Sequence, residues 1–210
     1  MERYTGPACI VCGLPVVSDV ASHCESCLKT PPFFSKAVCY GIYEGALRET
    51  VHLLKFKGVK RLARPVAELL AELPLPAADG IVPVPLHSSR LREREFNQTA
   101  LIGAHLSKLL GVPLLHDVLE KVRGTAPQTD VTGKERLKNV KNAFAAVSDM
   151  EGRRIIILDD VITTGATVNE CARVLRIAGA GSVTALALAR SIKEELQAGI
   201  VPVEHKDYNR

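Results

Sequence analysis

One segment of the chain, residues 155–167, combines residue types that suit the binding of a ligand. Four branched apolar residues at 155–158 predict a strand buried on both faces, and the carboxylates Asp159 and Asp160 follow it. A short turn with three threonines and one glycine comes next. We predict a helix after the turn, because apolar residues then recur at helical spacing, at Val168, Cys171, Ala172 and Leu175.

The turn has the composition of a phosphate-binding loop. Backbone N–H groups at a helix N-terminus have no partner within the helix and lie at the positive end of its dipole. The hydroxyls of Thr163, Thr164 and Thr167 add donors, and Gly165, followed by Ala166, lets the backbone approach an anion closely. We therefore expect residues 163–167 to bind a phosphate group.

The two carboxylates need a separate explanation, because a phosphate gains nothing from adjacent negative charge. Side chains alternate along a strand, so Asp159 and Asp160 can both turn toward one ligand only where the strand stops. Carboxylates accept hydrogen bonds from vicinal hydroxyls, and a phosphorylated ribose carries such a diol. The alternative interpretation is a surface turn between a core strand and a helix.

The order of residues in segment 155–167 resembles the signature of the type I phosphoribosyltransferases, which bind phosphoribosyl pyrophosphate (PRPP) with Mg²⁺. The resemblance implies that Asp159 and Asp160 hold the ribose 2′- and 3′-hydroxyls and that residues 163–167 surround the 5′-phosphate. Purine-salvage members similar to hypoxanthine-guanine transferase carry an Asp where this chain has Thr163, which counts against purine-base salvage.

A second anion-binding region is predicted after a short strand at residues 80–82, which must end there because Pro83 and Pro85 cannot sit in the middle of a sheet ladder. Ligands of doubly wound sheets bind outside the carboxyl ends of the strands, so this loop and the turn should share one edge. The candidates for contact with the leaving pyrophosphate are Val84, Pro85, Arg90 and Arg94. The alternative is an exposed basic helix start.

A long polar loop occupies residues 123–133 and is rich in Gly, Thr and Pro. Loops of this length inside a compact domain are usually functional or mobile. Type I transferases carry a flexible hood here that closes over PRPP. The resemblance therefore implies hood roles for Arg123, Gln128 and, on a short helix predicted after the loop, Arg136.

Four cysteines form two C-x-x-C pairs, Cys9 with Cys12 and Cys24 with Cys27, separated by eleven residues. Two such turns can place four thiolates around Zn²⁺, which predicts a structural zinc site without an open coordination position. So short a segment cannot form its own core, and metal binding would supply its folding free energy. Disulfides, a redox pair, or a ligand set that includes His23 are the alternatives.

With 210 residues and 47% hydrophobic content, the chain can form one α/β domain and a smaller unit. We expect a type I phosphoribosyltransferase fold, which is a doubly wound, mostly parallel sheet flanked by helices. The expected units are a zinc-binding module at 1–33, a phosphoribosyltransferase-like domain at 34–192 and a C-terminal tail at 193–210. Other predicted strands are 37–43, either 112–115 or 118–122, 143–147 and 183–189, and other predicted helices are 47–56, 62–73 and one with Ile102, Leu106 and Leu109 on one face.

The net charge of +4 is unevenly distributed. Residues 48–64 carry a local balance of +5 and residues 119–142 one of +3. Such clusters favour polyanions, either a pyrophosphate or a nucleic-acid backbone, although solvated helix faces are the alternative. The sequence contains no run of the roughly 18 apolar residues that a membrane span needs and no signal-like start, so we expect a cytoplasmic protein.

From residue 9 to residue 190, the order of motifs is similar to the ComF (GntX-like) branch of this superfamily. Besides the cysteine pairs and the turn, these motifs are Leu54-Lys55, Lys57-Gly58, Val82-Pro83-Val84-Pro85-Leu86, Arg94 with Phe96-Asn97-Gln98, Arg123 with Gln128, and Arg136 with Asn139. One departure is Glu95, where the branch usually has Gly. The resemblance implies a competence protein of DNA uptake in natural transformation, associated with single-stranded DNA and a helicase.

Three hypotheses follow. The first is a glycosyltransferase that moves the phosphoribosyl group of PRPP, bound with Mg²⁺, onto an acceptor. The second is an adaptor whose basic clusters contact DNA, mainly at phosphates, because aromatic residues are only 4% of the chain. The third is a PRPP sensor without turnover. The sequence identifies no acceptor, no general base and no oligomeric state.

Overall fold

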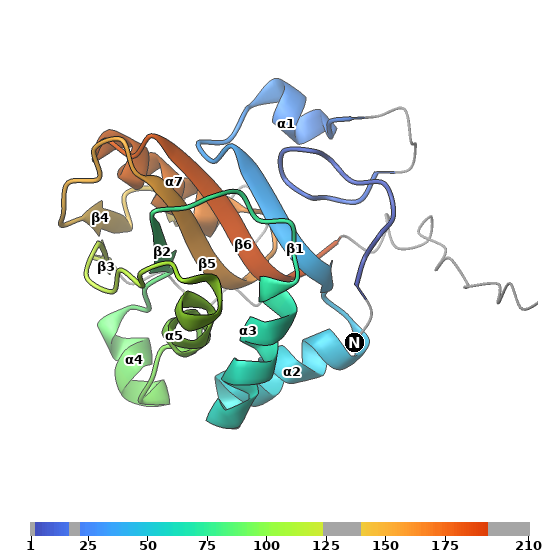
Figure 1. Cartoon of the computed structure of the whole chain (residues 1–210), viewed down its shortest axis with the longest axis vertical. Coiled ribbons are helices and arrows are strands. Elements are labelled where there is room, and N and C mark those ends of the chain that lie inside the picture. Colours follow the sequence, from blue (N-terminus) through green and yellow to red (C-terminus); the bar gives the residue numbers. More distant parts are fainter. Residues whose placement is uncertain (1–2, 17–21, 124–139, 193–210) are drawn as a thin grey trace, which may run out of the picture.

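The computed structural model describes residues 3–16, 22–123 and 140–192, and its centre is a parallel sheet of four strands (Figure 1). The strands are β1 (Lys36–Ile42), β2 (Gly80–Pro83), β5 (Arg154–Ile162) and β6 (Ser182–Arg190), in the order β1-β6-β5-β2. The isoleucine-rich strand β5 lies in the interior of the sheet. This position agrees with a strand that is apolar on both faces.

Helices cover both faces of the sheet (Figure 1). Ile156 and Leu158 of β5 pack on the face that is covered by α2 (Gly45–Phe56), α3 (Ala63–Ala71) and α5 (Gln98–Leu110). Ile155 and Ile157 pack on the opposite face, against α7 (Ala166–Ile177) and the four cysteines of the N-terminal segment. The alternation of side chains along β5 thus supplies two cores.

The shorter elements border the sheet. They are α1 (Glu25–Lys29), the 3₁₀ helix η1 (Lys60–Leu62), α4 (Ser88–Arg94) and an antiparallel pair formed by β3 (Leu119–Lys121) and β4 (Phe144–Ala146). Leu114 makes a single parallel bridge to Ile81 beside β2. The sequence predicts a strand at either 112–115 or 118–122. Both segments contain extended structure.

The expected fold class is confirmed: a mostly parallel sheet lies between helices, with the cysteine pairs beside it. Two expectations were wrong in detail. β5 does not end at the carboxylates, because β6 continues to pair with it as far as Ile162 and Arg190. Leu109 does not share the buried face of α5 with Ile102 and Leu106, since it is 51% exposed. Among the described residues, no helix combines the length and apolar character needed to cross a bilayer.

Candidate functional site

The turn at residues 163–167 leads from β5 directly into α7. Gly165 caps the helix with a φ of 81°, a conformation that suits glycine because it has no Cβ. The N–H of Ala166 is held by the Thr164 hydroxyl at 3.3 Å. Among the described residues, the N–H groups of Thr163, Thr164 and Gly165 have no hydrogen-bond partner. The turn therefore offers several backbone donors and a helix N-terminus to an anion.

Asp160 is only 3% exposed, and both of its carboxylate oxygens have protein partners. Oδ1 lies 2.7 Å from the Lys55 ammonium of α2, and Oδ2 accepts a hydrogen bond of 2.6 Å from the Gln98 amide of α5. A carboxylate oxygen can accept more than one hydrogen bond, so these contacts leave room for a hydroxyl donor. They also fix the side chain in one orientation.

Asp159 is in a different environment. Its Oδ1 accepts the Asp160 backbone N–H at 2.9 Å. Burial, and next the charge of Asp160, raise the pKa of Asp159 to about 7. Asp160 has two protein partners, whereas the negative charge of Asp159 is poorly compensated. Asp159 is therefore the better placed of the two carboxylates to bind a cation or a pair of hydroxyls.

A cavity of about 220 Å³ brings these residues together with the loop after β2. Of the residues predicted from sequence, it is lined by both carboxylates and by Val84, Pro85, Arg90, Arg94, Thr163, Gly165, Ala166 and Thr167. The loop after β2 is held by Asn97 and Thr99, whose side chains donate to the carbonyl of Val84 at 3.0 and 3.1 Å. The carboxyl ends of β2 and β5 thus form one edge of the site, as expected for this architecture.

Four predicted residues are not among those that line the cavity. Thr164 is exposed and does not line it. Arg123 donates instead to the carbonyl of Lys141 at 2.8 Å. Gln128 and Arg136 lie outside the described residues, as does most of the expected hood loop.

Sequence reasoning did not assign Lys55, Gln98, Tyr43, Lys121 or Phe144 to the site, yet all of them line the cavity. Lys55 and Gln98 belong to short motifs of the family resemblance, and this membership could have indicated their place in the site. Burial lowers the pKa of Arg94 and, with a smaller contribution from the charge of Arg90, also that of Lys121. Arg90, Arg94 and Lys121 thus line the same cavity as the two carboxylates.

The four cysteines of the N-terminal segment form a cluster in which the sulfur atoms all lie within 4.8 Å of one another. The sulfur atoms of Cys12 and Cys24 lie 3.5 Å apart, near the separation of about 3.8 Å that tetrahedral zinc with Zn–S bonds near 2.3 Å requires. All four side chains are buried. The cluster could hold a metal ion.

The chain is similar to several known proteins. A family model described as a phosphoribosyl transferase domain matches residues 97–208. Competence protein F of Haemophilus influenzae is 37% identical over 198 residues, which cover 88% of this chain and 85% of that protein. The DNA utilization protein YhgH of Salmonella typhi is 37% identical over 194 residues, covering 88% and 84%. Among solved structures, the glutamine PRPP amidotransferase of B. subtilis matches with 23% identity and a TM-score of 0.44, over 61% of this chain and 26% of that one.

Proposed function

Since the chain belongs to the ComF-like branch of the phosphoribosyltransferase family, we propose that it binds PRPP in the cavity at the carboxyl ends of β2 and β5 and transfers the phosphoribosyl group to an acceptor. The observation that carries this proposal is that Thr163 and Gly165, whose backbone N–H groups have no partner among the described residues, line one cavity together with Asp159. The donors suit a 5′-phosphate and the carboxylate suits the ribose diol.

The remaining residues suit the rest of the ligand. Arg90 and Arg94 line the cavity beside the loop that contains Val84 and Pro85, and they would attract a pyrophosphate. Mg²⁺, which this class of enzyme generally uses, would neutralise negative charge on the leaving group. The bond between C1′ and the pyrophosphate oxygen would break with its electron pair on the pyrophosphate, and a lone pair of the acceptor would bond to C1′.

Binding and pyrophosphate release test this proposal. Calorimetric titration with PRPP and Mg²⁺ should show binding to the wild-type chain and at least about tenfold weaker binding to Asp159→Asn, because a diol loses a charged acceptor. Asp79→Asn is the matched control, since Asp79 pairs with Arg154 at the opposite end of β5. Absence of PRPP binding to the wild-type chain would contradict the proposal. Binding without release of pyrophosphate from PRPP, whichever acceptor is added, would favour a sensor.

A second function, contact with single-stranded DNA, is favoured by a group of cationic and aromatic residues that we call the α2–α4 rim: His52, Phe56, Lys60, Arg94 and Phe96. Phe56 is 64% exposed, with the Arg94 guanidinium 5.2 Å and the His52 ring 5.1 Å from its centre. Lys60 lies 4.9 Å from the centre of the Phe96 ring. Phe56 thus offers an exposed aromatic ring beside a cation, which is what a stacked base and its phosphate require.

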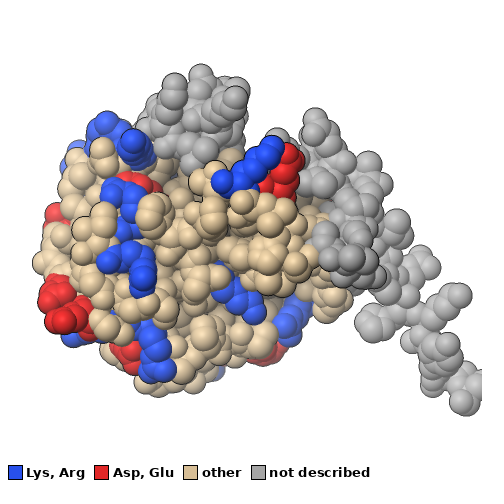
Figure 2. All heavy atoms as spheres, turned by 90° about the horizontal axis from the view of Figure 1, so that it is seen from above, with Lys and Arg blue, Asp and Glu red and all other residues tan. Residues whose placement is uncertain are grey.

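The extent of this surface limits the expected affinity. The rim contains two cations, Lys60 and Arg94, so a strand bound there would make few phosphate contacts. Its affinity should therefore fall with salt along a shallow but measurable slope. On the face shown in Figure 2, which lies away from α2 and α4, Lys and Arg side chains form several separate patches, some of them beside acidic side chains.

Fluorescence anisotropy with a labelled single-stranded oligonucleotide tests this surface. Phe56→Ala should weaken binding by about fivefold or more, because base stacking on an aromatic ring contributes about 1–3 kcal/mol. Leu109→Ala is the control, since Leu109 is an exposed apolar residue of α5 that does not belong to the rim. An affinity that does not change with salt, or equal effects of the two variants, would contradict a role of the rim in DNA binding.

A further inference from the structure

Arg190, the last residue of β6, is a buried cation that the proposed chemistry does not use. Its side chain is 5% exposed, and Nη1 donates to two consecutive carbonyls, those of Ile162 at 3.1 Å and Thr163 at 2.6 Å. Among the described residues, its Nε has no hydrogen-bond partner although it is buried. A buried charged group with an unsatisfied donor is costly, so its presence calls for an explanation.

The two carbonyls begin the turn that carries the phosphate donors. In a trans peptide the C=O and N–H point in opposite directions, and the structure contains no cis bond among its described residues. Arg190 therefore turns the N–H groups of Thr163 and Thr164 away from itself. These are two of the unpartnered donors of the proposed 5′-phosphate site.

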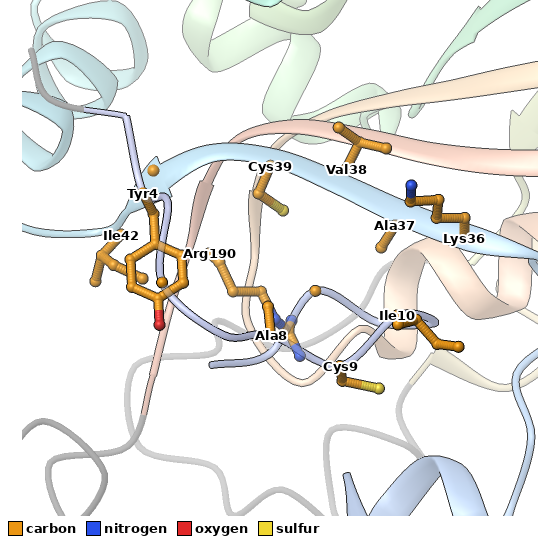
Figure 3. Close-up of a pocket in the computed structure, with 13 residues that line it drawn as sticks. Tyr4, Ala8, Cys9, Ile10, Lys36, Ala37, Val38, Cys39, Ile42 and Arg190 are labelled. Atoms are coloured by element: carbon orange, nitrogen blue, oxygen red, sulfur yellow. The ribbon is translucent and has the colours of Figure 1, made fainter. Parts of the chain in front are cut away.

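The other side of Arg190 faces the N-terminal segment. Figure 3 shows its side chain extending from β6 toward Ala8 and Cys9, below β1. Together with Ala8, Cys9 and Cys39, it lines a cavity of about 340 Å³ between the sheet and this segment. The segment is fixed to the sheet by hydrogen bonds from the Ala37 N–H to the Val11 carbonyl at 2.6 Å and from the Tyr4 N–H to the Tyr40 carbonyl at 3.1 Å.

The cysteine cluster borders the same side chain, because Cys9 lines one cavity together with Arg190. A zinc ion bound by four thiolates carries a net negative charge, which would favour a buried guanidinium nearby. Without the folded cysteine segment, Arg190 would be open to water, which competes for the guanidinium with the two carbonyls of the turn.

We propose that Arg190 is a positioning residue that couples the metal-holding cysteine segment to the phosphate-binding turn, so that loss of the metal weakens binding of a sugar phosphate at residues 163–167. This inference rests on the proposed function, because it assumes that the turn binds a phosphate. The coupling is reciprocal, so a bound sugar phosphate should also make the metal harder to remove.

A thermodynamic cycle tests the coupling. Ribose 5-phosphate is titrated calorimetrically into the zinc-loaded wild-type chain, Arg190→Met, the double variant Cys24→Ser/Cys27→Ser, and the combination of all three changes. Loss of the cysteine pair should raise the Kd by about fivefold or more in the wild-type background and by less than about twofold when Arg190 is already absent. An equal rise in both backgrounds, or a wild-type Kd for Arg190→Met, overturns the proposal.

A matched control separates this role from a general effect on stability. Arg176, near the other end of α7, donates from Nη1 to the carbonyls of Ala180 and Gly181, so Arg176→Met also removes an arginine that holds two carbonyls. It should leave the Kd for ribose 5-phosphate within about twofold of the wild type. A partial recovery is expected in Arg190→Lys, which keeps one donor for the Thr163 carbonyl.

Hydrogen exchange provides a second measurement if the cysteine variant does not fold. In the wild-type chain, removal of the metal with a chelator should accelerate exchange in a peptide that covers residues 164–170, because the N–H groups of Ala166 and Asn169 donate to Thr164 and Gly165 of the turn. Arg190→Met should show fast exchange in this peptide before the chelator is added. Unchanged exchange in the wild type overturns the coupling whether or not ribose 5-phosphate binds. If the wild-type chain binds no ribose 5-phosphate but shows the change in exchange, the proposed function fails and the coupling survives.

Discussion

At the scale of single residues, the two adjacent carboxylates have different environments. Asp160 is compensated by Lys55 and Gln98, which come from two different helices. Asp159 has no such compensation, and burial with the charge of Asp160 raises its pKa to about 7. Asp160 is therefore fixed by protein contacts, whereas Asp159 can bind a ligand group.

The raised pKa of Asp159 makes stability depend on pH. In the unfolded chain this carboxyl ionises near its usual pKa of 3.8, but in the folded chain it ionises only near pH 7. Its contribution to stability is therefore fully present below about pH 4 and is lost as the pH rises to 7. Relative to Asp159→Asn, the wild-type free energy of unfolding should fall by a few kcal/mol between pH 4 and pH 7. Urea unfolding across this range measures the difference, and a constant difference would contradict the assignment.

The pair of Lys55 with Asp160 predicts a second effect. Lys55→Met leaves a carboxylate that is 3% exposed without its cation, so the free energy of unfolding should fall by about 3 kcal/mol. The double variant Lys55→Met/Asp160→Asn should recover most of this loss, because a neutral amide needs no cation. Urea unfolding of both variants checks this, and equal stability of the single and double variants would show that the charge of Asp160 is compensated elsewhere.

At the scale of elements, the junction of α4 and α5 shows a local conflict between sequence and conformation. Glu95 caps α4 with a φ of 65°, in the left-handed region that favours glycine. Glycine is the residue that the ComF branch usually places here. In this chain a residue with a Cβ therefore adopts a conformation that glycine adopts without strain.

Glu95→Gly should consequently stabilise the protein. A gain of about 1 kcal/mol is expected, because the strain of a side chain in the left-handed region is removed. Thermal unfolding measures the gain, and Glu95→Ala serves as the control because it removes the carboxylate and keeps the Cβ. If the alanine variant gains as much as the glycine variant, the charge of Glu95 and not its backbone conformation is responsible.

At the scale of the whole molecule, the cysteine cluster belongs to the same core as the sheet. The four cysteines pack in one cluster of buried residues with Ile155 and Ile157 of β5 and with α7. A change in the cysteine segment should therefore reach the main domain. The boundary at residue 33 between a zinc module and the transferase-like domain stays a prediction.

Removal of the metal should then destabilise the entire protein. A chelator is expected to lower the Tm by about 10 °C or more, in one cooperative transition, because binding of structural zinc contributes directly to folding. Differential scanning calorimetry with and without the chelator measures this effect, and addition of Zn²⁺ in excess is the control. A main transition at an unchanged Tm would show that the cysteine segment folds independently of the sheet.

The sequence by itself determined the features that depend on neighbouring residues. The buried strand, the turn with its free donors, the helix after it and the two cysteine pairs are all local patterns, and the structure has each of them. Tertiary structure alone decided which distant side chains meet at these features. Gln98 reaches Asp160 across 62 residues, and Arg190 reaches the Thr163 carbonyl across 27. Such contacts depend on the order of the strands and on which helix covers which face, and no local spacing encodes them.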